Sequence, residues 1–177
     1  MRGSPDIAPG SERPDPPDEI IVEALASRLV RPVTVVGVGS DLRGDDAFGV
    51  EVARALLAEG APAGAAVFDA GVAPENYAER IALASPQTVL VADAARFDGA
   101  AGELKVLDPE ELGWQTVGTH APSLELLADY LARRCGAKTV LLACQPGANA
   151  LGEAMSEVVR GAVARAVAAL RRALTAG

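Results

Sequence analysis

The chain has 177 residues, a mass of 18.0 kDa, 50% hydrophobic residues and a formal net charge of −8. This length suffices for one domain with a full core, and the negative charge argues against nucleic acid or an anionic membrane as a partner. No apolar run reaches the roughly 18 residues that a membrane span needs, and no secretory leader opens the sequence, so we expect a cytoplasmic protein.

The start of the chain differs in composition from the rest. Residues 1–18 are rich in Pro, Gly and charge and show no periodicity, which predicts a flexible arm. A modest helical stripe of apolar residues follows at positions 19–29. We therefore expect residues 19–177 to form a single α/β domain.

Five short apolar segments predict strands, at residues 33–38, 65–69, 88–92, 103–107 and 138–143. Helical spacing predicts further helices, at about residues 46–59, 76–84, 122–134 and 155–174. Helices separate the first three strands, which gives parallel pairing with right-handed crossovers. The fourth strand follows the third too closely for a crossover helix, so it must run antiparallel at an edge. The predicted fold is a three-layer α/β/α sandwich around a five-stranded, mostly parallel sheet.

A glycine-rich segment, GVGSDLRGDD, connects the first strand to the next helix. The spacing of Gly39 and Gly44 imitates a phosphate-binding loop, but Asp45 and Asp46 occupy the positions of the Lys and the Ser or Thr. The dinucleotide-binding pattern also fails, because its third glycine position is Leu42. Two carboxylates would repel a phosphate, so we expect this loop to hold a cation.

Three side chains that bind metals follow elements that meet at one edge of the predicted sheet. Asp46 follows the first strand, Asp93 ends the third strand, and His120, the single histidine, precedes a helix that begins near Pro122. A divalent cation would offset the repulsion between the carboxylates, and a helix N-terminus disfavours imidazolium, which keeps the ring neutral for a metal. Carboxylate and imidazole ligands suit nickel or zinc.

Each of these residues also has a structural explanation. Asp45 or Asp46 could cap the following helix, and Asp93 could bind loop amides at the end of its strand. A lone histidine such as His120 is more often a structural residue than a ligand. The convergence of all of them on one edge favours the metal site.

Four further residues border the predicted site. Gly44 belongs to the loop, and Asp69 follows the second strand, where it could support the loop or transfer protons. Glu75 could cap a helix, and Gln145 lies in a turn that ends a strand. We expect Gly44, Glu75 and Gln145 to support the loops or the substrate.

Taken in order, the motifs GVGS through GDD, DAGVAPE, VADA, TH and QP resemble the hydrogenase maturation proteases over about residues 33–172. The resemblance implies a phosphorylase/hydrolase-like fold and an endopeptidase. Such an enzyme removes a C-terminal extension from the large-subunit precursor of a nickel-iron hydrogenase after nickel insertion. The metal contacts of the family fall on Asp46, Asp93 and His120. The resemblance thus implies nickel supplied by the precursor, for which zinc or another divalent ion could substitute.

Other mechanisms and function classes stay open at this point. A sole histidine cannot both bind a metal and activate a serine, which argues against a catalytic triad. If a metal activates water, Asp45 or Asp69 is the expected base. The alternatives are a non-catalytic metal-binding chaperone of hydrogenase assembly and a nucleotide-dependent enzyme on the same fold. Ser40 and Ala47 depart from the common family pattern, but neither change removes a ligand.

Overall fold

The computed structural model describes residues 18–109 and 120–175. Its strands are β1 (Val33–Val38), β2 (Ala65–Gly71), β3 (Thr88–Ala94), β4 (Leu104–Leu107) and β5 (Lys138–Cys144). Its helices are α1 (Glu19–Ala26), α2 (Phe48–Ala58), α3 (Ala78–Leu83), α5 (Ala121–Cys135) and α6 (Glu157–Thr175), with short 3-10 helices η1 (Gly44–Ala47) and η2 (Pro74–Tyr77). Each predicted strand is present, with small differences at the ends. The arm predicted for residues 1–18 lies, except for Asp18, outside the described residues.

The strands form one sheet in the order β2-β1-β3-β5-β4. All neighbouring pairs are parallel except β4 and β5, which confirms the predicted antiparallel edge strand. The first and third strands of the chain are neighbours, with Gly37 of β1 paired with Ala92 of β3. The loops that leave these two strands therefore start side by side at the carboxyl edge of the sheet.

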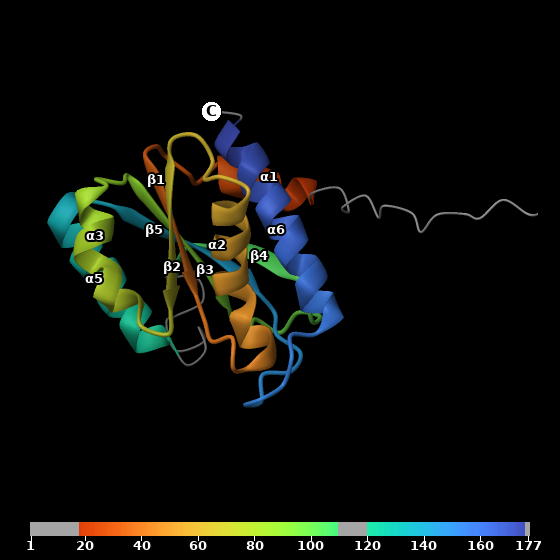
Figure 1. Cartoon of the computed structure of the whole chain (residues 1–177). Coiled ribbons are helices and arrows are strands. Elements are labelled where there is room, and N and C mark those ends of the chain that lie inside the picture. The colour runs from red at the N-terminus through yellow and green to blue at the C-terminus, as the bar shows by residue number, and fades with distance from the viewer. Residues whose placement is uncertain (1–17, 110–119, 176–177) are drawn as a thin grey trace, which may run out of the picture.

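Helices cover both faces of the sheet. Figure 1 shows α3 and α5 on one face and α1, α2 and α6 on the other, which confirms the three-layer sandwich. Every residue of β1 and β3 is buried, because central parallel strands are covered on both sides. Burial on both sides explains why the sequences of these two strands are apolar at nearly every position. No described helix is long and apolar enough to cross a membrane.

The helix predicted to begin at Asp46 is in fact divided into η1 and α2. Neither Asp45 nor Asp46 caps it, since Arg43 and Ala47 hold the N-cap positions and neither makes a side-chain cap hydrogen bond. Glu75 likewise makes no cap bond, because it lies inside η2. The capping explanations are therefore wrong for all three carboxylates, which leaves them available for other contacts.

Candidate metal-contact site

The loop after β1 folds tightly back onto Asp46. Gly39 has a φ of +139°, and a Cβ at this position would lie 1.9 Å from the backbone oxygen of Asp46. Only glycine tolerates both the conformation and the close approach. The amide of Ser40 then donates to the backbone oxygen of Asp46 at 3.2 Å and to its Oδ2 at 3.1 Å. These contacts fix the direction of the Asp46 carboxylate.

Asp46 and His120 are in direct contact despite their separation in the sequence. Nε2 of His120 lies 3.3 Å from Oδ2 of Asp46, and both side chains are buried. The hydrogen bond with Asp46, the charge of Asp93 and a hydrogen bond to the backbone of Val72 together outweigh burial and raise the pKa of His120. The sequence-based expectation of a ring influenced by the helix N-terminus did not include these two carboxylates, which act on the ring in the opposite direction.

Asp93 is the most enclosed member of the group. Its side chain is fully buried, and Oδ1 accepts a hydrogen bond from the amide of Ala94 at 2.8 Å. Its Oδ2 is buried and has no hydrogen-bond partner among the residues that the structure describes. Burial first, and then the charge of Asp46, raise the pKa of Asp93 well above its ordinary range, against the opposing effect of His120. A buried carboxylate oxygen without a partner is costly, and a cation would satisfy it.

The three predicted ligands converge, but they do not form a ready-made metal site. Within residues 18–109 and 120–175, no group of three or more His, Cys, Asp or Glu side chains is arranged to hold a metal ion. The hydrogen bond between Asp46 and His120 joins Oδ2 and Nε2, the two atoms that would bind a metal ion. The chemistry of the donor set and the orphaned oxygen of Asp93 fit a divalent metal, which would replace the proton shared by Asp46 and His120. The metal role of these residues stays a prediction.

Asp45 faces a different part of the chain from Asp46. Its Oδ2 accepts from the amides of Gly147 and Ala148 at 2.8 and 2.9 Å, and its Oδ1 accepts from the amide of Ser156 at 2.8 Å. Burial alone would raise the pKa of Asp45, but these hydrogen bonds outweigh it and lower the pKa. The structure thus gives this fully buried carboxylate the task of holding the loop between β5 and α6. The predicted catalytic role has no contact in its support.

Gly44 and Gln145 make loop contacts at the same edge of the sheet. The amide of Gly44 donates to the backbone oxygen of Glu153 at 3.0 Å. Oε1 of Gln145 accepts from the amides of Phe97 at 2.8 Å and Gly99 at 3.4 Å. Gly44 and Gln145 are both buried, so these contacts join the three loops that follow β1, β3 and β5.

Asp69 belongs to a surface ion-pair cluster centred on Arg54, a residue that the sequence alone did not single out. Nε of Arg54 donates to Asp69 Oδ2 at 2.7 Å, and the same guanidinium reaches Glu51 at 3.0 Å and Asp41 at 3.3 Å. Oδ1 of Asp69 accepts from the amide of Gly71 at 3.3 Å. The cluster ties α2 to the end of β2 and to the loop after β1. The spacing of Glu51 and Arg54 on one helix face was the available signal.

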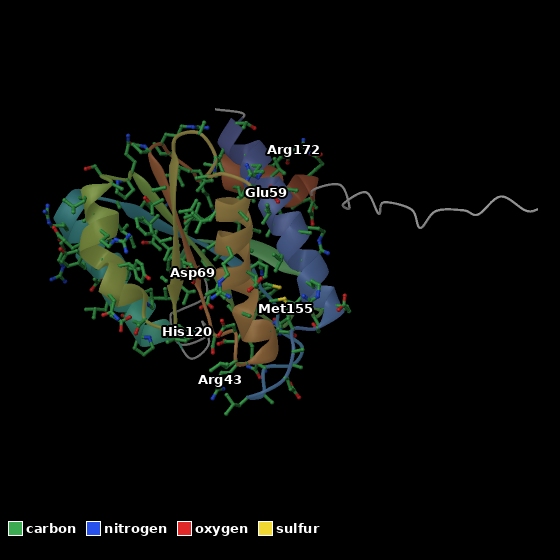
Figure 2. All side chains as sticks on the ribbon, viewed as in Figure 1. Arg43, Glu59, Asp69, His120, Met155 and Arg172 are labelled. Atoms are coloured by element: carbon green, nitrogen blue, oxygen red, sulfur yellow. The ribbon has the colours of Figure 1, made fainter. Side chains whose placement is uncertain are left out.

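Figure 2 locates two of the predicted site residues, His120 and Asp69, in the molecule. Figure 2 shows Arg43 and His120 at the end toward which β2 points, and Asp69 part of the way along that strand, whereas Glu59 and Arg172 lie at the opposite end. Glu75, in η2, keeps one carboxylate oxygen, Oε2, buried with no hydrogen-bond partner in the described part of the chain. The structure does not assign it a role.

Comparisons with known proteins find similarity to hydrogenase maturation proteases. A family model described as hydrogenase maturation protease matches residues 50–173. The hydrogenase 3 maturation protease of Escherichia coli K12 is 31% identical over 128 residues, which cover 71% of this chain and 80% of that protein. The family match includes Asp93 and His120 but begins after Asp46.

Solved structures cover a larger share of the chain than the family model does. The crystal structure of the [NiFe] hydrogenase maturation protease HycI from Thermococcus kodakarensis KOD1 superposes with a TM-score of 0.75 at 32% identity, over 88% of this chain and 99% of that one. The E. coli hydrogenase maturating endopeptidase HybD has a TM-score of 0.65 at 23% identity, over 78% of this chain and 88% of that one, a likeness of fold alone.

Proposed function

The chain belongs to the hydrogenase maturation protease family, whose members are hydrolases of peptide bonds, and on this premise we propose its substrate and the role of its site. The proposed substrate is the large-subunit precursor of a nickel-iron hydrogenase. The proposed reaction removes the C-terminal extension of that precursor after nickel has been inserted. The cytoplasmic location expected from the sequence stays a prediction.

One observation carries the proposal for the site. The partnerless Oδ2 of Asp93 is buried beside a second carboxylate and the only histidine of the chain. We propose that Asp46, Asp93 and His120 contact nickel carried by the precursor. An oxygen, an oxygen and an imidazole nitrogen from separate loops suit such an ion, and zinc could take its place.

The residues around this group have separable tasks in the proposed reaction. Asp46 and His120 give up their mutual hydrogen bond to contact the substrate's nickel, while Asp45 keeps the neighbouring loop in place. Asp69 is the better candidate for proton transfer, because its carboxylate is 27% exposed whereas Asp45 is enclosed by amides. Bound nickel would fix the scissile bond at the carboxyl edge of the sheet.

The test is the substitution Asp46→Asn. Asn keeps the size of the side chain but loses the charge that attracts a divalent ion, so processing of nickel-loaded precursor should fall at least about tenfold. The free energy of unfolding should stay within about 1 kcal/mol of wild type, because the Ser40 contact can be kept. Mass spectrometry of the precursor measures the cleavage.

The matched control is Asp129→Asn, which changes an exposed carboxylate of α5 outside the site and should leave processing unaltered. Near-normal cleavage by Asp46→Asn would remove it from the metal contact. A wild-type protein that binds nickel-loaded precursor without shortening it would instead support the chaperone alternative.

A further inference from the structure

The two edges of the sheet are protected very differently. The edge strand β4 has four residues, carries the exposed Lys105 and lies against α1. A short strand, an edge lysine and a covering helix are the usual devices that prevent a sheet edge from pairing with another chain. The opposite edge strand, β2, has seven residues and no lysine, and α2 packs against it on one face of the sheet.

The β2 edge is long and nearly uncharged. It has seven residues with the sequence AAVFDAG, and all but Ala70 are partly exposed. Its single charged side chain, Asp69, is held by Arg54. In Figure 1, β2 lies in front with helices to both sides and none over it. An edge of this kind presents a row of unpaired N–H and C=O groups.

The edge leads directly into the candidate site. Gly71, at the carboxyl end of β2, accepts a hydrogen bond from the amide of Gly39 at 3.0 Å, and Gly39 begins the loop that leads to Asp46. A cavity of about 260 Å³ is lined there by residues that include Leu42, Gly71 and Val72. Leu42 and Val72 are exposed apolar side chains. A peptide that leaves the site thus meets an open strand edge next to apolar side chains.

We propose that the extension of the precursor binds as an added strand on the outer edge of β2, antiparallel to it. This inference rests on the proposed function. β2 runs toward the site, whereas the extension begins at the cleaved bond and runs away, so the two segments point in opposite directions. The seven residues of β2 at roughly 3.3 Å each span about 23 Å, which gives room for an extended peptide segment of about six or seven residues.

Pairing through the main chain has a chemical consequence for specificity. Backbone hydrogen bonds supply affinity without regard to side chains, and alternate side chains contact the flanking helices. The proposed partner is therefore an extended, proline-poor peptide. Proline within the paired segment would remove a hydrogen bond to the edge.

The first test measures backbone amide hydrogen exchange across the whole chain. The probe is a synthetic peptide of the extension and its flanking residues at about 1 mM, mixed with intact protein that processes the precursor. Amides within Ala65–Gly71 should exchange at least about fivefold more slowly with peptide, and those of Leu104–Leu107 should not change. Unchanged exchange in Ala65–Gly71 would overturn the proposal, as would protection that grows with protein concentration without peptide, because a second copy would then occupy the edge.

The second test uses a pair of proline substitutions, Ala66→Pro and Val67→Pro. Neighbouring strand residues point their N–H groups to opposite sides. Ala66→Pro removes an N–H that faces β1, and Val67→Pro removes an N–H on the free edge. The first variant should be strongly destabilised. The second should fold and process precursor with KM raised at least about threefold and kcat nearly unchanged.

These measurements separate the two proposals. A folded edge variant with wild-type KM would overturn the strand addition while leaving the protease function intact. A wild-type protein that cleaves no precursor would instead refute the proposed function. If both proline variants fail to fold, the exchange experiment still decides the question.

Discussion

Asp45→Asn should destabilise the protein strongly, although it replaces an acidic side chain by one of the same size. The Asp45 carboxylate is buried and accepts hydrogen bonds from the amides of Gly147, Ala148 and Ser156. If the single oxygen of Asn keeps the first two, its NH₂ group faces the third amide, donor against donor. A hydrogen bond to a charged acceptor contributes about 1.5–3 kcal/mol, and a buried unsatisfied donor costs about 1–3 kcal/mol. We expect a loss of about 3 kcal/mol.

Urea unfolding followed by circular dichroism measures this loss. At about 2–4 °C per kcal/mol for a chain of this size, the melting temperature should fall by about 6–12 °C. Asp41→Asn is the matched control, since its carboxylate is 58% exposed, and its stability should change by less than about 0.5 kcal/mol. Processing by Asp45→Asn, measured well below its melting temperature, should stay within about threefold of wild type.

The opposite result would refute the structural role of Asp45 in holding the loop between β5 and α6. A variant with wild-type stability that has lost processing at least about tenfold would show that Asp45 acts on the substrate, as the sequence alone had suggested. The hydrogen bonds of the carboxylate would then contribute little to folding.

Three further outcomes are expected. Deletion of residues 1–17, which keeps the α1 cap at Asp18, should leave the melting temperature within about 5 °C of wild type, and a larger fall in a thermal scan would show that the arm packs on the domain. Equilibrium dialysis should show weak Ni²⁺ binding that a mild chelator removes, because the ion must displace the proton shared by Asp46 and His120. Stoichiometric nickel after such dialysis would contradict this. Asp69→Asn should lower processing of the precursor about a hundredfold, because the variant loses the proposed proton-transfer group. Its stability should fall by less than about 1 kcal/mol, since the ion pair with Arg54 is partly exposed. Unimpaired cleavage would leave Asp69 only a structural role.

The sheet could be predicted because its determinants are local in the sequence. The runs that form β1 and β3 are apolar at nearly every position, as burial on both faces requires. The short connection between β3 and β4 leaves no room for a crossover helix, and this fixed the antiparallel edge. The predicted helix start at Asp46 was wrong, because α2 begins at Phe48 after the short helix η1. The spacing of apolar residues shows where a helix buries its face, but it does not show which contacts the carboxylates of Asp45 and Asp46 make.

The site could be predicted only in part. Asp46, Asp93 and His120 were expected to converge because the carboxyl ends of neighbouring parallel strands share one edge, and the structure brings Asp46 and His120 into contact. The partners of Asp45 lie 102 to 111 residues away and are backbone amides, which leave no trace in residue types. The raised pKa of His120 was missed for a related reason, since it depends on how close two carboxylates lie to the ring.

The geometry of η1 explains how two adjacent aspartates serve two different purposes. A 3-10 helix has three residues per turn, so successive side chains point about 120° apart. Asp45 therefore turns toward the loop that leads into α6, and Asp46 turns toward His120 at the start of α5. Because α5 and α6 cover opposite faces of the sheet, this single turn links both outer layers to the end of β1. The consequence is that changes at Asp45 should act mainly on stability and changes at Asp46 mainly on processing, although the two residues are joined by one peptide bond.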